Sequence, residues 1–402
     1  MKVVLQPDPA EPMVAINLRY RVGSWWDPKG REGLAHLLEH LMFAEGEGSD
    51  ALGVLEASGA LRINAVTGLE RTEYQGLVPP EVVPRALWLE ARRMAGIDPN
   101  TVSRRLEQEK RVVVQELRER LYDQPYGAIE GTLQARLFPE PHPLHHLPIG
   151  SEASVFAATV EEVLAFHRLH YGPKHSCLVL AGPISVEEVR ALITTYFGPL
   201  APQEAPPAAL APAPVLKAEP IFGPEWTSGY SRVSLVWHAP NITAPESRAL
   251  EVFGAMLSFG ATSRAGIANL AQQSILNLKA GRYDTPAGGL FRVDAIVSPG
   301  ASPLIARSRV RSVIETYIEY KPQPEELAGT TTRLQVEVLR AVGDLEARAR
   351  LLQDSRAEFG NAAAVLSLAK LWSEVSATEI QEVLNKHLTH EPQVLVAQPV
   401  RR

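Results

Sequence analysis

The stretch Gly33-Leu34-Ala35-His36-Leu37-Leu38-Glu39-His40-Leu41-Met42-Phe43 places three polar side chains in an otherwise apolar run. We predict an α-helix here, on which positions i and i+4 lie on one face about one turn apart. His36 and His40 have that spacing, so together they can bind one metal ion. Glu39 lies three residues after His36, and its carboxylate overhangs the same face. Burying such groups is costly, which favours a functional site over incidental core residues.

The order of the histidines and the glutamate in this motif indicates a kind of chemistry. H-x-x-E-H is the inverted form of the H-E-x-x-H zinc-peptidase signature. The motif is short, so two core histidines beside an incidental glutamate remain the alternative at this point. A catalytic zinc usually has three protein ligands and an open position for water, so a third ligand must come from elsewhere in the chain.

We expect the third ligand in the helical run from Glu107 to Leu117. Glu109 and Glu116 are seven residues apart, so a helix places both on the same side. A solvated, salt-bridged helix face is an equally good interpretation by periodicity alone. The flanking arginines that suit this interpretation are Arg104, Arg105, Arg118 and Arg120.

Composition is typical of a soluble globular protein with more than one domain. The 402 residues are too many for one ordinary core, and 45% are hydrophobic and 21% charged. A formal net charge of −6 argues against nucleic-acid binding. The single cysteine, Cys177, excludes an internal disulfide framework and a cysteine-based zinc site. No stretch is apolar enough for a signal peptide or a membrane span, which predicts a cytoplasmic protein, or a periplasmic one if an export signal was removed before Met1.

A shift to proline and alanine at residues 199–216 predicts an extended linker. The linker would separate a metal-binding domain at 1–198 from a second domain at 217–402. Both halves show strand and helix patterns in the same order, although the metal motif occurs only in the first. We therefore predict an α+β fold of two structurally similar domains, each a mixed, mostly antiparallel sheet packed with helices. In the second half we predict strands at 231–238 and 289–296 and helices at 247–259, 263–278, 303–320 and 324–346.

Further motifs follow the metal motif in a fixed order. A strand containing Asn64-Ala65-Val66-Thr67 comes first, and Glu109 and Glu116 lie 69 and 76 residues after His40. The later motifs are Asp123-Gln124-Pro125-Tyr126-Gly127, His142-Pro143 with Gly150, and Thr159 to Tyr171-Gly172-Pro173. In this order they resemble the pitrilysin/insulinase family of zinc peptidases, in particular its small bacterial members, which are relatives of the mitochondrial processing peptidase. The resemblance covers nearly the whole chain and implies a mitochondrial-processing-peptidase-like/LuxS-like fold.

The resemblance also implies a role for each residue of the metal motif. His36, His40 and Glu116 would bind Zn²⁺, and Glu39 would act as the general base of peptide-bond hydrolysis. Glu109 would support catalysis by hydrogen bonding to a ligand histidine.

The same family binds its substrate as an extra strand on an exposed sheet edge. Leu61, Arg62, Asn64 and Ala65 correspond to that edge and are the predicted substrate-binding residues. The segment from Gly59 to Ala65 has one residue more than the usual Gly-Gly-x-x-Asn-Ala form, which leaves the register of this edge open.

The chain departs from the family in its second half. Complete members have an arginine and, seven residues later, a tyrosine, which hold the substrate and stabilise the oxyanion. The corresponding positions here are Ala271 and Leu278, and the nearby Arg282 and Tyr283 are adjacent to each other. Some bacterial members divide the zinc site and the Arg/Tyr pair between two similar chains, so the resemblance implies a heterodimer with a homologous partner subunit.

We therefore expect a zinc-dependent endopeptidase that hydrolyses short or unfolded peptides in a chamber closed by its partner. A non-catalytic assembly or peptide-binding subunit of the same family is the alternative. Intact His36, Glu39 and His40 argue for the enzyme, and the missing Arg/Tyr pair argues for the alternative. No P-loop, dinucleotide-binding fingerprint or nucleophile elbow occurs in the sequence.

Overall fold

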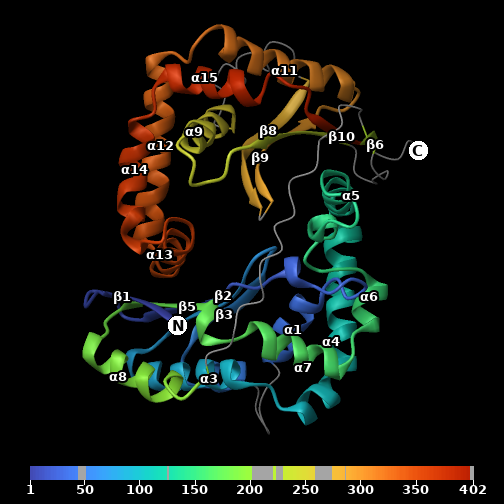
Figure 1. The fold of residues 1–402 in the computed structure, drawn as a ribbon. Coiled ribbons are helices and arrows are strands. Elements are labelled where there is room, and N and C mark those ends of the chain that lie inside the picture. The colour runs from blue at the N-terminus through green and yellow to red at the C-terminus, as the bar shows by residue number, and fades with distance from the viewer. Residues whose placement is uncertain are drawn as a thin grey trace. The chain divides into compact units, whose positions relative to one another are not determined.

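The computed structural model describes residues 1–43, 51–124, 126–201, 221–222, 230–258, 274–285 and 287–398 (Figure 1). Its internal contacts divide the chain into two units, each built from three segments. The first unit contains Met1–Arg120, His146–Ala209 and Arg340–Ala363, and the second contains Leu121–His145, Leu210–Leu339 and Ala364–Arg402. Among the described residues, no helix is both long enough and apolar enough to cross a membrane.

The first unit is built on a five-stranded mixed sheet. Its strand order is β1 (Lys2–Pro7), β5 (Ser176–Gly182), β2 (Val14–Tyr20), β4 (Thr72–Val78) and β3 (Leu61–Thr67). Only the β1–β5 pair is parallel. Every residue of the central strand β2 is buried, so both faces of the sheet are covered there. Strand β3 lies at one edge of the sheet.

Helices cover the two faces of this sheet unequally. Helix α13 packs on β2 and β5 on one face, whereas most of the other helices lie on the opposite side (Figure 1). The helices are α1 (Leu34–Phe43), α2 (Ala51–Ala57), α3 (Val83–Ala95), α4 (Pro99–Arg118), α6 (Glu152–Ala157), α7 (Val160–His170), α8 (Val186–Phe197) and α13 (Leu345–Phe359). Thr159 caps α7 with Glu162 in the predicted capping box.

Helix α13 belongs to the first unit although it follows the predicted linker in the sequence. Its Leu345 and Ala349 pack against the small and apolar side chains Ala15, Val179 and Ala181 of the sheet. The polar groups of the helix add contacts to the same unit. Gln353 donates to the Cys177 carbonyl at 2.9 Å, Arg348 pairs with Asp8 at 2.9 Å and Glu11 at 2.7 Å, and Asp354 pairs with Arg19.

Two segments therefore depart from the predicted domains 1–198 and 217–402. Residues 121–145 group with the second unit, and residues 340–363 group with the first. The predicted helix at 324–346 is also two helices, because Asp344 is extended and caps the start of α13 by accepting from the Ala347 amide at 2.9 Å. The linker stays a prediction, since residues 202–216 lie outside the described residues.

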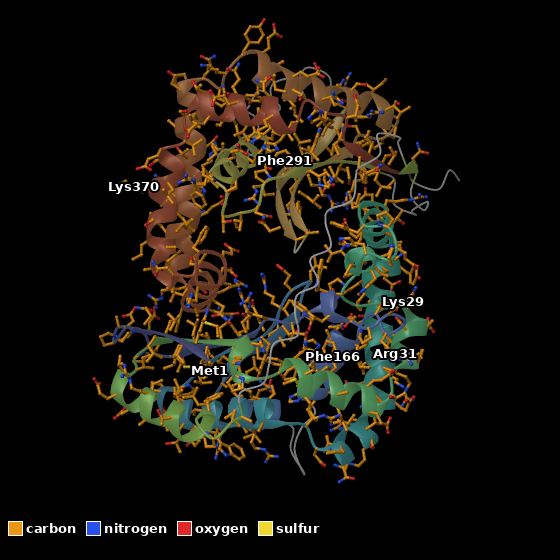
Figure 2. All side chains as sticks on the ribbon, viewed as in Figure 1. Met1, Lys29, Arg31, Phe166, Phe291 and Lys370 are labelled. Carbon is orange, nitrogen blue, oxygen red and sulfur yellow. The ribbon has the colours of Figure 1, made fainter. Side chains whose placement is uncertain are left out.

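The second unit repeats the sheet of the first. Its strand order is β6 (Ile221–Phe222), β10 (Gln393–Ala397), β7 (Ser231–Ala239), β9 (Gly288–Val297) and β8 (Ile275–Thr285), and only β6–β10 is parallel. Its helices are α5 (Gly127–Leu137), α9 (Glu246–Ser258), α11 (Pro303–Glu319), α12 (Pro324–Gly343), α14 (Val365–Ser373) and α15 (Ala377–His387). The aromatic residues Phe253, Phe291 and Tyr317 pack in its core, where Figure 2 labels Phe291. The prediction of two similar α+β domains is confirmed.

The predicted helix at 263–278 is wrong at its C-terminal end. Residues 259–273 lie outside the described residues, but Ile275–Leu278 form the start of strand β8. Asn277 and Leu278 pair there with β9, and Ile275 is buried in the core. Cross-strand pairing of this kind is a tertiary contact that a local sequence pattern does not contain.

We predict that Ala349→Glu destabilises the first unit. The new carboxylate would be placed in a buried apolar contact, at a cost of about 3 kcal/mol in the free energy of unfolding. The melting temperature followed by circular dichroism measures this loss. Arg350→Glu is the matched control on the exposed side of the same helix, with an expected change within about 0.5 kcal/mol. Equal melting of the two variants would contradict the assigned packing of α13.

Candidate metal centre

The start of helix α1 is held by a buried carboxylate. Asp27 accepts hydrogen bonds from the amides of Gly33 at 2.7 Å and Ala35 at 2.8 Å. Burial raises the pKa of Asp27 well above its ordinary value, although the two amide hydrogen bonds lower it. The side chain thus satisfies amides at the helix N-terminus that have no intrahelical partner.

A close backbone contact fixes the same end of α1. A Cβ atom at Gly150 would lie only 2.0 Å from the Glu32 carbonyl oxygen, so no larger residue fits. Gly150 also has a φ of +73°, which glycine adopts readily. The hydroxyl of Ser154, at the start of α6, donates to the same Glu32 carbonyl at 2.7 Å. The loop that ends at Gly150 therefore helps to orient the metal motif.

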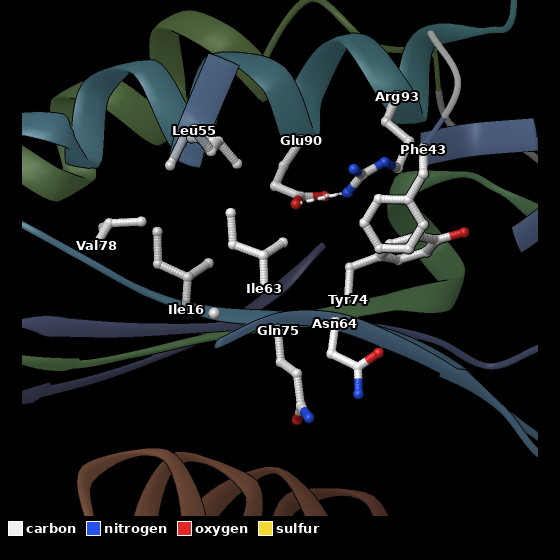
Figure 3. A pocket seen from close by; sticks show the side chains of 12 residues that line it. Ile16, Phe43, Leu55, Ile63, Asn64, Tyr74, Gln75, Val78, Glu90 and Arg93 are labelled. Atoms are coloured by element: carbon white, nitrogen blue, oxygen red, sulfur yellow. Dashed lines mark hydrogen bonds and ion pairs between the residues drawn. The ribbon is translucent and has the colours of Figure 1, made fainter. Parts of the chain in front are cut away.

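The C-terminal end of α1 rests on a buried ion pair. Figure 3 shows the small cavity beside it, of about 30 Å³, in which Glu90 and Arg93 form two contacts of 2.6 Å. The Arg93 guanidinium lies over the Tyr74 ring at 4.2 Å and donates to the Met42 carbonyl at 3.4 Å. Arg93 thus links helix α3, strand β4 and the end of α1.

Helix α4 brings the third donor to α1. Glu116 Oε2 lies 3.3 Å from His40 Nε2 and 3.6 Å from His36 Nε2. One donor atom from each of the three side chains lies within 4.8 Å of the others. Among the described residues, this is the only such group of histidine, cysteine, aspartate and glutamate side chains. The structure thus brings the three predicted metal ligands together.

Glu109 lies on the other side of His40. Its Oε2 is 3.6 Å from His40 Nδ1, the ring nitrogen that does not face Glu116. Arg120 forms an ion pair with the second carboxylate oxygen of Glu116. These two contacts orient the ring and the carboxylate of two predicted metal ligands from outside the predicted ligand set, as is common around protein metals.

Glu39 is almost fully buried, with 6% of its surface exposed. The Thr67 hydroxyl on β3 donates a short hydrogen bond to Glu39 Oε2. Thr67 Oγ1 lies 3.3 Å from the hydroxyl of Thr72, its partner across the hairpin, and Thr72 donates to the Val22 carbonyl at 3.0 Å. This series of hydrogen bonds holds one carboxylate oxygen of Glu39 and leaves the other oxygen available.

The electrostatics of the site favour a bound cation. Burial, and after it the charge of His40, lower the pKa of His36 to about 4. Burial also lowers the pKa of His40, but Glu109 and Glu116 more than offset this and raise it to about 9. The hydrogen bond to His40 lowers the pKa of Glu116, whereas burial raises the pKa of Glu39. On binding Zn²⁺, His40 would lose the proton that its raised pKa places on the ring. Two imidazole nitrogens and a carboxylate form one of the ligand sets of catalytic zinc, so these residues fit Zn²⁺.

The metal centre opens into a cavity of about 410 Å³ within the first unit. Its lining residues are His36, Glu39, His40, Phe43, Asn64, Ala65, Val66, Thr67, Arg105, Glu109, Glu116 and Arg120. The edge strand β3 thus forms one wall with Asn64–Thr67, and α4 forms another. Two of the predicted substrate-binding residues, Asn64 and Ala65, lie in this wall.

The other two predicted substrate-binding residues, Leu61 and Arg62, do not line the cavity. Arg62 instead pairs with Asp344 at 3.5 Å and Glu346 at 3.4 Å. It also has a φ of +52° at an irregularity in the β3–β4 pairing between Leu61 and Asn64. Arg62 and Ile63 of β3 lie there opposite the single residue Gly76 of β4, so a β-bulge absorbs the additional residue seen in the sequence.

Sequence reasoning missed several residues that position the site. Thr67 stands in the quoted strand motif without a predicted role. Asp27 lies seven residues before Leu34, the first residue of α1, which is too far to be recognised as a helix cap from the sequence. Arg120 was grouped with the arginines of a solvated face. Thr67 acts through a contact between two elements, which a local pattern does not contain. The four-residue spacing of Glu116 and Arg120 is the one signal of these contacts in the sequence.

Of the two positions at which the Arg/Tyr pair is predicted to be missing, Leu278 lies in strand β8. Ala271 is outside the described residues, and Leu278 packs against the core of the second unit. Arg282 donates to the Pro240 carbonyl at 2.9 Å, and its side chain is almost fully buried. Tyr283 is partly exposed.

Two family models match the chain. The model described as "Insulinase (Peptidase family M16)" matches residues 2–134, which include the metal centre, and "Peptidase M16 inactive domain" matches residues 157–334. The chain belongs to the pitrilysin/insulinase family. An uncharacterized zinc protease of Mycobacterium bovis is 30% identical over 200 residues, which are 49% of this chain and 45% of the relative. A zinc protease of Helicobacter pylori is 28% identical over 191 residues, 46% of this chain and 41% of the relative.

These alignments span less than half of each relative, but solved structures match the whole fold. A protease from Helicobacter pylori has a TM-score of 0.88 at 18% identity, with 99% of this chain and 96% of that chain covered. A putative M16-like peptidase from Alicyclobacillus acidocaldarius has a TM-score of 0.83 at 20% identity, with 99% and 95% covered. At these identities the likeness shows the fold, and it agrees with the family assignment.

We predict graded losses of zinc from variants of this centre. Glu116→Gln removes an anionic ligand, so the purified protein should lose its bound zinc on dialysis. Glu109→Gln leaves all three ligands in place and should weaken zinc affinity by about 10–100-fold. Competition with a chromogenic chelator measures both effects. His145→Gln is the control outside the group, and a loss of affinity in it equal to that of Glu116→Gln would contradict the assignment.

Proposed function

We propose that the chain is a zinc-dependent endopeptidase that hydrolyses short or unfolded peptides. The single observation that supports this most directly is the buried carboxylate of Glu39 beside the converging donors of His36, His40 and Glu116. A structural metal site has no need for an additional buried carboxylate. Zinc bound there would polarise the scissile carbonyl and make an attacking water more acidic.

Glu39 would act as the general base and then as the proton donor. Its Oε2 is occupied by the Thr67 hydrogen bond, so the second oxygen is available to take a proton from the attacking water. The burial that raises its pKa also makes the protonated form accessible, so Glu39 can pass the proton to the leaving amine. Thr67 would keep the carboxylate in one orientation through both steps.

The peptide would bind along the edge strand β3, in the cavity wall formed by Asn64 and Ala65. An edge strand offers unpaired backbone groups to an extended segment, which explains a requirement for short or unfolded substrates. Leu61 is 56% exposed at the start of the same strand, and with Arg62 it would contact the more distant part of the peptide.

A homologous partner subunit would supply the Arg/Tyr pair and close the chamber. In strand β8, as the structure describes it, no arginine is followed by a tyrosine seven residues later. Leu278, the position expected for the tyrosine, packs against the core of the second unit. A non-catalytic assembly or peptide-binding subunit is the second candidate, which the match of the second half to an inactive-domain model favours.

We predict that Glu39→Gln abolishes peptide hydrolysis without loss of zinc. Removing a general base costs about 10²–10⁴-fold in rate, while the three ligands stay intact. Cleavage of a quenched fluorescent peptide is measured for this chain alone and mixed with a homologous chain that carries the Arg/Tyr pair. Zinc content is measured in parallel.

Hydrolysis only in the mixture, lost in Glu39→Gln, supports the two-chain peptidase. Equal hydrolysis by the single chain would contradict the need for a partner. A chain that binds zinc but hydrolyses no peptide with or without the partner would instead support the non-catalytic subunit.

We predict that Thr67→Val lowers kcat by about tenfold with little change in KM or zinc content. The valine keeps the shape and strand propensity of threonine but cannot hydrogen-bond to Glu39. Thr67→Ser keeps the hydroxyl and should restore most of the rate. If Thr67→Ser were as slow as Thr67→Val at unchanged stability, the hydroxyl would not be what orients Glu39.

A further inference from the structure

Arg105 is the one charged residue of the cavity lining to which the proposed mechanism gives no role. It lies on α4, four residues before Glu109 and eleven before Glu116. These spacings place all three side chains within about 40° of one another around a helix with 3.6 residues per turn. Arg105 therefore belongs to the helix face that supplies the third metal ligand.

The charge of Arg105 is uncompensated in the described part of the chain. No ion pair or hydrogen bond joins its guanidinium to another described residue, whereas Arg120 pairs with Glu116, Arg118 with Glu152 and Arg104 with Thr101. The cavity lining contains three carboxylates, Glu39 among them, and two guanidinium groups. With Zn²⁺ bound, its net charge becomes positive.

We propose that Arg105 binds a carboxylate of the peptide substrate, so that the enzyme prefers peptides with an acidic group at a set distance from the scissile bond. This inference rests on the proposed peptidase function and deepens it. Arginine suits this role because its planar guanidinium binds a carboxylate through two parallel hydrogen bonds and stays charged at every physiological pH.

The geometry of α4 sets that distance. Eleven residues of helix separate Arg105 from the ligand Glu116 by about 16 Å along the axis. An extended peptide advances about 3.3 Å per residue, so this length corresponds to about five residues. The long side chains of Arg105 and of the acidic substrate residue can each take up several ångströms of this length. The acidic group is therefore expected about three to five residues from the cleaved bond.

Binding is measured on the zinc-loaded Glu39→Gln chain, so that no turnover is needed. Fluorescein-labelled peptides carry one Glu at successive positions on either side of a cleavage site mapped with the wild type, each beside its Gln isostere. Free and amidated C-termini distinguish a side-chain carboxylate from a terminal one. Arg105→Met is compared with Arg111→Met, a control on the exposed opposite face of α4.

We expect Kd to be about tenfold lower for the Glu peptide at the preferred position, as for one charge-assisted hydrogen-bonded pair. Arg105→Met should remove this preference and Arg111→Met should keep it. A preference confined to free C-termini supports the same site with a terminal carboxylate as its ligand. Equal binding of Glu and Gln peptides, a preference that survives in Arg105→Met, or no binding of any peptide overturns the inference.

The proposed function is tested separately by wild-type hydrolysis in the presence of the partner. Hydrolysis without any preference for acidic peptides would overturn the role of Arg105 and leave the peptidase proposal intact. Binding that depends on Arg105 without hydrolysis would overturn the peptidase proposal and support a peptide-binding subunit.

Discussion

The whole metal centre depends on how rigidly helix α1 is held in the first unit. Asp27 caps its first turn, Gly150 allows the loop that ends there to pack against the start of the helix, and Arg93 donates to the Met42 carbonyl in its last turn. The leucines between the polar residues bury the helix against the sheet and α4. Because the faces of α1 that turn away from the cavity are buried, His36 and His40 have little freedom to turn away from Glu116.

The surroundings of α1 give the carboxylates of Glu116 and Glu39 opposite shifts in pKa. Glu116 is partly exposed and paired with His40 and Arg120, which favours its charged form as a ligand. Glu39 is buried and held by one hydroxyl, which makes its protonated form more accessible. Two glutamates within one cavity thus have different proton affinities, and this is the arrangement that a metal ligand and a general base require.

The two repeated sheets differ in how they can be used. Strands β3 and β8 lie at equivalent edges of the two sheets, β3 in the first unit and β8 in the second. The first edge lies in the wall of the cavity that contains the metal centre, whereas the second includes Leu278, whose side chain packs into a core. The two sheets thus share a topology, but among the described residues the group of side chains that could hold a metal lies in the first unit alone.

The sequence by itself determined the local chemistry of the site, because i, i+4 histidines with an intervening glutamate and two glutamates seven apart follow directly from helix periodicity. It also predicted two similar α+β domains from repeated strand and helix patterns. Only the tertiary structure decided that α13 covers the first sheet and that residues 275–278 extend a strand. It alone also placed Thr67 on Glu39 and Arg105 in the cavity. These outcomes depend on contacts between residues far apart in the chain, which no local pattern encodes.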